Sequence, residues 1–175
     1  MVAPHIAMPQ DADLPDTVRA VLRQLPPLNV FRMMAVVPES FQPFVDIAGS
    51  VLLKSSLDPH LRELAILRVG KVTRATYEWQ QHVAFAPKAG VTADEIAAIA
   101  ADGPVTTLGD EQNLMCRVAD EISLHVRLSD ETLQALLDRY GNVKAAELIL
   151  CVSYFNMLSR FLESTRVPLE QAAGV

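Results

Sequence analysis

Apolar residues recur at helical spacing along most of the chain, and no segment shows the alternation of apolar and polar residues that marks a half-buried strand. In residues 111–126, Leu114, Val118, Ile122 and Val126 follow one another at intervals of four. This spacing places their side chains on one face of a helix. The pattern predicts an all-α protein, a compact single-domain bundle of roughly seven to nine helices.

Residues with strong capping preferences mark where several of these helices begin and end. Asp58 precedes Pro59, which combines a favoured N-cap residue with a proline in the first turn. Thr92 and Glu95 have the spacing of a capping box. Gly141 is placed to end a helix that begins after residue 129. These signals predict separate helices on either side of Gly141.

Composition limits the partners and the location expected for the chain. Residues 1–175 are about the size of one domain, so we expect a single domain. Residues 1–14 are expected to form an N-terminal arm. Because this arm has no signal-peptide features, we expect a cytoplasmic protein. Half of the residues are apolar, yet no apolar run reaches the ~20 residues of a membrane helix. We therefore expect no membrane span and assign the apolar surplus to homo-oligomer contacts. The net charge of −6 is not collected into blocks, so no nucleic-acid partner is expected.

Glu78 and His82 stand at i and i+4 in the helix predicted from about residue 75 to 88, so their side chains share a face. Trp79 lies on the neighbouring apolar stripe. A carboxylate in this position can hold an imidazole in one tautomer and favour its protonated form, as a proton-transfer residue requires. An exposed ion pair of little energetic value is the alternative interpretation.

Glu63 lies among leucines and isoleucine in the segment LRELAIL. A buried carboxylate needs a partner or a raised pKa. Arg62, Arg68 or His82 could supply that partner, and a structural salt bridge is as compatible with the sequence as a catalytic role. A metal site built from Glu63, Glu78 and His82 is conceivable, but the Glu-x-x-His pair of di-iron bundles has a different spacing and occurs twice. We expect no metal and no cofactor.

Residues 61–99, LRELAILRVGKVTRATYEWQQHVAFAPKAGVTADEIAAI, resemble the core of the carboxymuconolactone decarboxylase family of the alkylhydroperoxidase D-like superfamily. The resemblance rests on Arg62-Glu63-Leu64, on Glu78 with His82, and on the AGVTADEI that follows. A weaker similarity extends over residues 154–167. The resemblance implies a compact all-α bundle that assembles as a trimer or hexamer.

In the peroxidase branch of this superfamily, a glutamate is followed by Cys-x-x-Cys-x-x-x-His. The register of the resemblance places the glutamate at Glu63, the two cysteines at Ala75 and Glu78, and the histidine at His82, so both thiols are missing. The two cysteines of the chain, Cys116 and Cys151, are instead expected as small buried apolar residues. The remaining pattern resembles the decarboxylase branch, although Tyr77 stands where that branch often has a first histidine.

The resemblance implies a cofactor-independent proton-transfer enzyme that decarboxylates or isomerises a small cyclic or lactone carboxylic acid. His82 is the expected proton donor, Glu78 its support and Glu63 an orienting or relaying acid. Trp79 and Tyr77 are expected as walls of the substrate site, and Arg68 or Arg74 as the group that holds the substrate carboxylate. The alternatives are an alkylhydroperoxidase-like antioxidant protein and a non-catalytic oligomeric scaffold that binds a small ligand.

Overall fold

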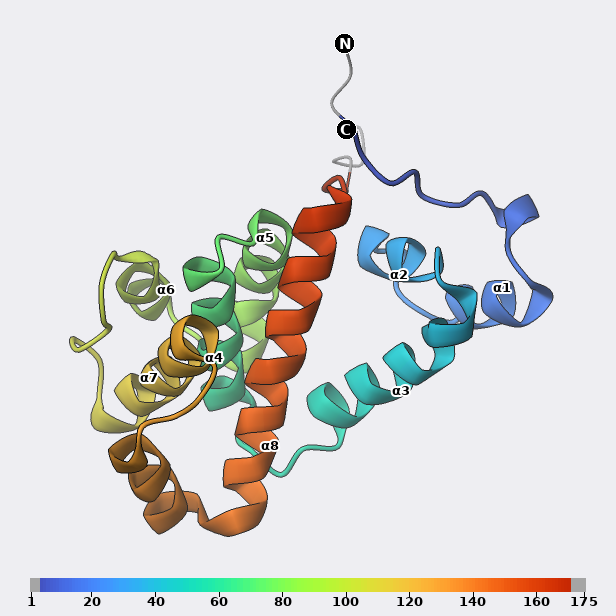
Figure 1. Cartoon of the computed structure of the whole chain (residues 1–175). Coiled ribbons are helices and arrows are strands. Elements are labelled where there is room, and N and C mark those ends of the chain that lie inside the picture. Colours follow the sequence, from blue (N-terminus) through green and yellow to red (C-terminus); the bar gives the residue numbers. More distant parts are fainter. Residues whose placement is uncertain (1–3, 171–175) are drawn as a thin grey trace. The chain divides into compact units, whose positions relative to one another are not determined.

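The computed structural model describes residues 4–170, and every regular element in this range is helical (Figure 1). The all-α prediction is therefore confirmed, and the eight α-helices of the described residues fall within the predicted number. The elements are η1 (Asp11–Asp13), α1 (Asp16–Leu22), α2 (Asn29–Met34), α3 (Pro38–Leu53), α4 (Pro59–Val72), α5 (Thr76–Phe85), η2 (Ala86–Ala89), α6 (Ala93–Ala100), α7 (Asp110–His125) and α8 (Asp130–Thr165).

Backbone contacts divide the chain into two compact units. One comprises Met1–Lys54 with Phe161–Val175, and the other comprises Ser55–Arg160. The second unit holds the whole segment in which the sequence predicted a site. That residues 1–175 act as one domain stays a prediction.

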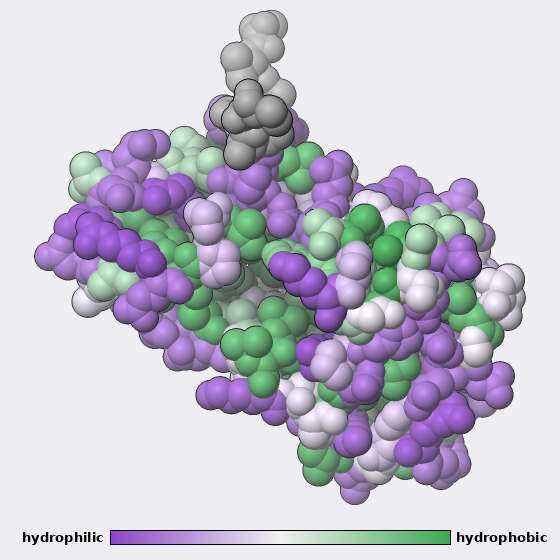
Figure 2. Space-filling view, turned by 180° about the vertical axis from the view of Figure 1, so that it is seen from behind, coloured by the Kyte–Doolittle hydropathy of each residue, from purple (hydrophilic) through white to green (hydrophobic). Residues whose placement is uncertain are grey.

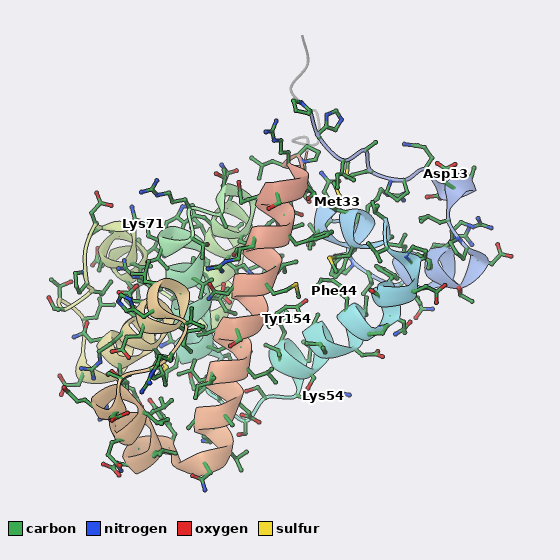
Figure 3. All side chains as sticks on the ribbon, viewed as in Figure 1. Asp13, Met33, Phe44, Lys54, Lys71 and Tyr154 are labelled. Carbon is green, nitrogen blue, oxygen red and sulfur yellow. The ribbon has the colours of Figure 1, made fainter. Side chains whose placement is uncertain are left out.

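The first unit contains α1, α2 and α3. Met33 of α2 and Phe44 of α3 lie in its buried interior (Figure 3). Its predicted N-terminal arm is described from residue 4, and residues 1–3 of that prediction lie outside the described range. Within the arm, the Ile6 N–H donates to the carbonyl of Thr165, and the Arg32 guanidinium donates to the Pro9 carbonyl at 3.0 Å. The described part of the arm is thus hydrogen-bonded to its own unit.

Helix α4 forms the centre of the second unit and packs against α5, α6 and α7. Leu61 and all residues from Glu63 to Gly70 are buried, which explains the high apolar content of this segment. Gly70 has a specific role, because a Cβ atom there would lie 3.3 Å from the backbone nitrogen of Trp79. The missing side chain allows α4 and α5 to approach each other closely.

The predicted helix ends are found in the second unit. The Asp58 side chain accepts hydrogen bonds from the backbone N–H groups of His60 and Leu61, and Thr92 and Glu95 form the capping box. Gly141, with φ 68° and ψ 177°, interrupts α8 and separates two helical segments. Glycine tolerates this conformation and other residues do not, which explains the break.

Within residues 4–170, α8 is the one helix that meets the length and hydropathy expected of a membrane span. Of the 18-residue window that meets them, 56% is buried inside the protein. Core helices of soluble bundles have the same two properties. Apolar side chains also reach the surface among polar ones (Figure 2), as expected for a chain that is half apolar.

Candidate functional site

Helices α4 and α5 bring Glu63, Glu78 and His82 together. The Nδ1 atom of His82 lies 2.7 Å from Oε1 of Glu63, a hydrogen-bond distance, and its Nε2 atom lies 3.6 Å from Oε2 of Glu78. Of the partners that the sequence left open for Glu63, the structure thus selects His82. We call these three residues the Glu–His–Glu cluster.

The cluster is buried. The exposed fractions of the side chains are 10% for Glu63, 6% for Glu78 and 12% for His82. A solvent-exposed i,i+4 pair on a wet helix face would leave both side chains largely accessible. The interpretation of Glu78 and His82 as an ordinary surface ion pair is therefore excluded by the structure.

Two aromatic rings fix the orientation of the His82 imidazole. Phe155 of α8 packs against it edge to face, with ring centroids 5.0 Å apart and planes at 89°. Phe85 lies 6.3 Å away at 64°. Such edge-to-face pairs are favourable beyond the burial of area. Neither phenylalanine was expected at the site from the sequence, and for Phe155 no local signal exists because it lies more than 70 positions from His82 in the chain.

Tyr154 lies next to Phe155 on α8, and their rings also meet edge to face, 5.3 Å apart. It is 6% exposed. Burial, with a smaller contribution from the charge of Glu78, raises the pKa of Tyr154, so the phenol stays protonated at neutral pH. An uncharged hydroxyl is therefore held in the neighbourhood of the Glu78 carboxylate.

Opposing effects act on the pKa of His82. Burial is the largest and lowers it, but the hydrogen bond to Glu63 and the charges of Glu63 and Glu78 outweigh burial and raise the pKa above the ordinary histidine value. His82 therefore retains a proton on both ring nitrogens over more of the neutral range than a free histidine does. Its Nδ1–H donates to Glu63, whereas Nε2 lies beyond hydrogen-bond distance of Glu78. Nε2 is thus the position from which a proton can be transferred.

Tyr77 and Trp79, which were expected to form the walls of the substrate site, lie in different environments. Tyr77 is buried in the unit, with 2% exposure. Trp79 is half-buried and, together with Lys71, Arg74 and Ala100, lines a small open hollow of ≈ 350 Å³. Arg74 is exposed and has a positive φ of 58° at the junction of α4 and α5. Trp79 and Arg74 thus lie together, in a hollow whose lining does not include the Glu–His–Glu cluster.

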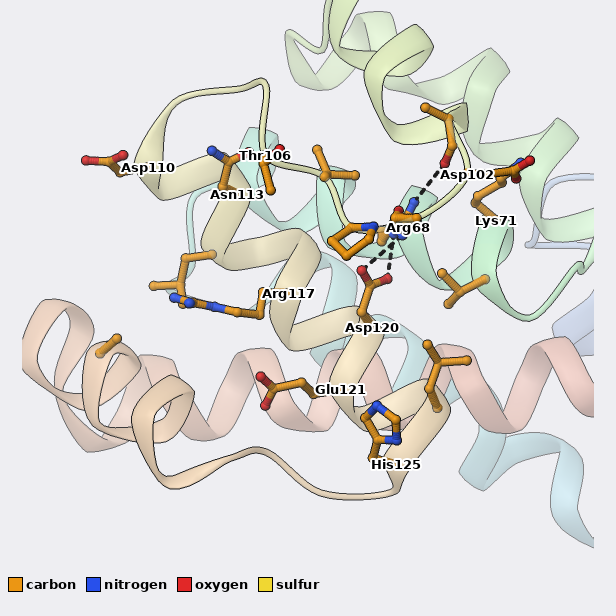
Figure 4. A pocket seen from close by; sticks show the side chains of 18 of the residues that line it. Arg68, Lys71, Asp102, Thr106, Asp110, Asn113, Arg117, Asp120, Glu121 and His125 are labelled. Atoms are coloured by element: carbon orange, nitrogen blue, oxygen red, sulfur yellow. Dashed lines mark hydrogen bonds and ion pairs between the residues drawn. The ribbon is translucent and has the colours of Figure 1, made fainter.

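Arg68 does not have the role expected from the sequence. Its guanidinium pairs with Asp120 through Nε at 2.5 Å and Nη2 at 3.0 Å, and it donates to the carbonyls of Ile99, Ala101 and Gly103. These contacts consume all five N–H donors of the arginine, and Figure 4 shows the pairing with Asp120. Arg68 is 3% exposed and cross-links α4 to α7 and to the loop after α6. It has no donor left for a substrate carboxylate, and we withdraw that role.

A cleft of ≈ 1020 Å³, which was not expected from the sequence, opens beside Arg68. It lies along α4 and α7 and is bordered by residues 101–106 and by the start of α8 (Figure 4). Its charged side chains have both signs, among them Lys71, Arg117, Arg139, Asp110 and Asp138. Because these residues come from separate segments, only the folded chain brings them together.

The two cysteines are buried, as expected, and both are free. Burial raises the pKa of each thiol to about 12, so neither forms a thiolate at neutral pH. Ala75 and Glu78, the residues that the resemblance aligns with the two thiols, are both buried. Neither has a thiol, so neither can supply the thiolate that disulfide chemistry requires.

No group of three His, Cys, Asp or Glu side chains in residues 4–170 has the arrangement of a metal site. In the Glu–His–Glu cluster, each ring nitrogen of His82 faces a carboxylate oxygen. This arrangement suits a protonated imidazole, since a nitrogen that ligates a metal must offer a lone pair.

The fold and the buried cluster define the class of protein: an all-α protein of the alkylhydroperoxidase D-like type, with a histidine held between two glutamates. Residues 38–121 match the model of the Carboxymuconolactone decarboxylase family, so the resemblance to this family found in the sequence is confirmed. A comparison with curated proteins found no match.

Two solved structures are similar over nearly the whole chain. The crystal structure of an alkylhydroperoxidase AhpD core, an uncharacterized peroxidase-related protein from Ralstonia eutropha JMP134, has a TM-score of 0.81 at 17% identity, and the match covers 97% of this chain and 94% of that one. An uncharacterized peroxidase-related protein from Silicibacter sp. TM1040 has a TM-score of 0.78 at 18% identity, with coverage of 94% and 90%. At such low identity, the likeness shows the fold.

Proposed function

We propose that this protein is a cofactor-independent proton-transfer enzyme of the carboxymuconolactone decarboxylase type, which decarboxylates or isomerises a small cyclic or lactone carboxylic acid. The observation that supports this most is the burial of His82 between two carboxylates, one at 2.7 Å and the other at 3.6 Å. A protonated imidazole in a water-poor site is a suitable acid for protonating carbon.

The proposed chemistry begins with loss of CO2 from the substrate. The bond between the carboxyl carbon and the ring breaks, and its electron pair is delocalised into the conjugated carbonyl of the substrate. His82 then delivers its Nε2 proton to the ring carbon and is reprotonated from solvent. Glu63 holds the imidazole through Nδ1 and stabilises the protonated form, and Glu78 stands on the Nε2 side.

The distances refine the roles expected for the two glutamates. Glu78 was expected to support His82, and Glu63 to act as an orienting or relaying acid. Glu63 has the hydrogen bond to His82 and Glu78 has the longer contact, which favours the orienting role for Glu63 over support by Glu78. We assign the orienting role to Glu63 and place Glu78 where it can act on the substrate or on the transferred proton.

An alkylhydroperoxidase-like function is the second candidate, since both similar structures are described as peroxidase-related. The buried, protonated thiols of Cys116 and Cys151 argue against it. A non-catalytic scaffold is the third candidate. Against it stands the energetic cost of burying two carboxylates and an imidazole, which a purely structural core avoids by using apolar residues.

The test is a screen of cyclic and lactone carboxylic acids that follows CO2 release and lactone absorbance, run beside a peroxide-reduction assay. With a substrate in hand, we expect His82→Gln to lower kcat/KM by about 10²-fold or more, as for loss of a general acid. His125→Gln, on the exposed end of α7, is the matched control and should retain activity. A loss below tenfold in His82→Gln contradicts the proposed role.

The peroxide-reduction assay tests the alkylhydroperoxidase-like alternative. We expect no peroxide reduction by the unaltered chain. Turnover that disappears in the Cys116→Ala/Cys151→Ala variant would assign the activity to the thiols, and turnover that persists in this variant would overturn the thiol argument itself.

A further inference from the structure

The hydroxyl of Ser159 on α8 is buried and makes no hydrogen bond. Ser159 is 1% exposed, and its Oγ is the one buried side-chain oxygen or nitrogen atom in residues 4–170 that lacks a hydrogen-bond partner. A buried hydroxyl in this state costs free energy, because it has given up its contacts with water and gained none in return. Such groups are rare in folded proteins, and each of them calls for a physical reason.

A serine in a helix ordinarily donates to a carbonyl three or four positions back. Thr165, six positions further along α8, does this: its Oγ1 donates to the carbonyl of Leu162 at 3.1 Å. For Ser159, the carbonyl three positions back belongs to Asn156, and it accepts from the Arg160 guanidinium at 3.0 Å. The Ser159 hydroxyl is thus left with an unused donor.

Ser159 lies on the face of α8 that packs toward the Glu–His–Glu cluster. It follows Phe155 by four positions, so the two side chains share a face of the helix. The Phe155 ring packs against the His82 imidazole, with ring centroids 5.0 Å apart. Helix α5, which carries His82, lies beside the C-terminal half of α8 (Figure 1). Ser159 is therefore about 6 Å along the helix axis from Phe155, given a rise of ~1.5 Å per residue.

The proposed reaction needs a donor that the Glu–His–Glu cluster does not supply. When CO2 leaves, the electron pair moves into the conjugated carbonyl of the substrate, and negative charge develops on its oxygen. A hydrogen-bond donor aimed at that oxygen stabilises the charge, most effectively where water is excluded. His82 delivers its proton to carbon, and Arg68 has no donor left. The carbonyl oxygen therefore requires a separate donor near His82.

We infer that the Ser159 hydroxyl donates a hydrogen bond to the carbonyl oxygen of a cyclic or lactone carboxylic acid that is bound between Ser159 and His82. The inference rests on the proposed function. The O–H bond of Ser159 stays intact throughout: the substrate oxygen takes up the electron pair as CO2 leaves, and the pair returns to form the carbon–hydrogen bond when His82 delivers its Nε2 proton. Ser159 is thus a substrate-binding residue and not a nucleophile.

This role explains why a hydroxyl is kept without a partner in the protein core. The carbonyl oxygen of the substrate supplies the missing acceptor, so binding recovers the free energy that burial of the hydroxyl costs. A ring without a carbonyl leaves the hydroxyl unpaired and is bound less well. Ser159 therefore selects for acids whose ring carries a carbonyl group.

The first experiment needs no substrate and tests the unpaired state of the hydroxyl. Ser153→Ala, at an exposed position of the same helix, measures the gain in stability from helix propensity alone. Ser159→Ala removes a group that makes no hydrogen bond, so we expect its urea midpoint to be at least as high as that of Ser153→Ala. A lower midpoint would show that the hydroxyl has a partner in the free protein and would overturn the inference.

The second experiment measures binding by calorimetry with paraconic acid, a saturated lactone acid that has no conjugated path for loss of CO2. We expect Ser159→Ala to weaken its binding by about three- to tenfold, as for loss of one hydrogen bond. Tetrahydrofuroic acid, the same ring without the carbonyl, should bind equally to the unaltered chain and to Ser159→Ala. Equal affinity of paraconic acid for the two proteins, or no binding of it to the unaltered chain, overturns the inference.

Turnover separates this inference from the proposed function. With an active substrate, we expect Ser159→Ala to lower kcat by about 10²-fold with a smaller change in KM, and Ser153→Ala to retain activity. Turnover that survives Ser159→Ala at more than about a tenth of the original kcat would leave the proposed function in place and remove the role of Ser159. Binding of paraconic acid that depends on Ser159, without turnover of any acid in the screen, would remove the proposed reaction and leave Ser159 as a binding residue.

Discussion

The imidazole of His82 on α5 hydrogen-bonds to the carboxylate of Glu63 on α4 at 2.7 Å, although the two residues are 19 positions apart in the chain. Both side chains are nearly buried. A hydrogen bond to a charged group contributes about 1.5–3 kcal/mol. This contact therefore joins the two helices and sets the protonation of the imidazole at the same time.

Replacing Glu63 by glutamine should lower the pKa of His82. The amide oxygen can still accept from Nδ1, but the negative charge that favours the imidazolium is removed. Titration of the His82 ring resonances by NMR measures the change. Glu111→Gln, whose carboxylate accepts a hydrogen bond from Tyr140 at 2.6 Å, is the control and should leave the His82 titration in place. A His82 pKa that does not fall in Glu63→Gln would show that Glu63 does not govern the proton.

The raised pKa of His82 should make the free energy of unfolding depend on pH. Its pKa is raised in the folded chain, so its contribution is complete below the ordinary histidine value of ~6.5 and is lost as pH rises through the raised value. We expect the free energy of unfolding in urea to fall between about pH 6 and about pH 8 by more in the unaltered chain than in His82→Gln. Equal slopes in the two proteins would contradict the raised pKa.

Removing the ring of Phe155 should allow the His82 imidazole to reorient while Glu63 and Glu78 remain in place. Phe155→Leu keeps the site apolar but abolishes the edge-to-face contact, so His82 should lose its single orientation and kcat should fall more than KM changes. Phe41→Leu is the matched control: Phe41 is 1% exposed in the first unit, and its loss should reduce stability alone. Proton exchange at Nδ1, followed by NMR, should quicken in Phe155→Leu and remain unchanged in Phe41→Leu.

Replacing Arg68 should damage the fold, because its five donors are all used internally. A lysine in Arg68→Lys cannot reproduce the paired contact with Asp120 and three carbonyl contacts, so we expect a loss of about 3–5 kcal/mol in the free energy of unfolding. Arg139→Lys, at an exposed position in the cleft, should change it by less than about 0.5 kcal/mol. Urea denaturation of both variants measures the difference. A stable Arg68→Lys would mean that the guanidinium is dispensable to the fold.

The features that could be predicted from the sequence depend on residues that are close together in the chain. The caps at Asp58 and Thr92 and the break at Gly141 follow from backbone preferences that act within a few residues, and the structure has all three. The sharing of one face by Glu78 and His82 likewise follows from helical geometry. Glu63 was indicated by its place in an apolar segment, with His82 as one of three possible partners, and only the folded chain selects among the three.

The parts that could not be predicted depend on contacts between distant segments. Phe155 reaches His82 only after α8 has packed on α5, and nothing in the sequence around either residue indicates the pair. Arg68 stands one helical turn and one residue after Glu63 and was expected to bind a substrate. The end of α6 and the loop after it supply the three carbonyls that accept from Arg68, and their direction is fixed only in the folded unit.

The close contact at Gly70 makes the spacing of the Glu–His–Glu cluster sensitive to small changes in the packing of α4 and α5. Its hydrogen atom faces the backbone of Trp79, and a methyl group in that place would have to be accommodated within 3.3 Å of a main-chain nitrogen. Shifting α5 by a few tenths of an ångström would suffice, and such a shift is of the same size as the difference between a short hydrogen bond and a stretched one. The close approach of α4 and α5 at Gly70 therefore contributes to the spacing between Glu63 and His82, and through that hydrogen bond to the acidity of the imidazole.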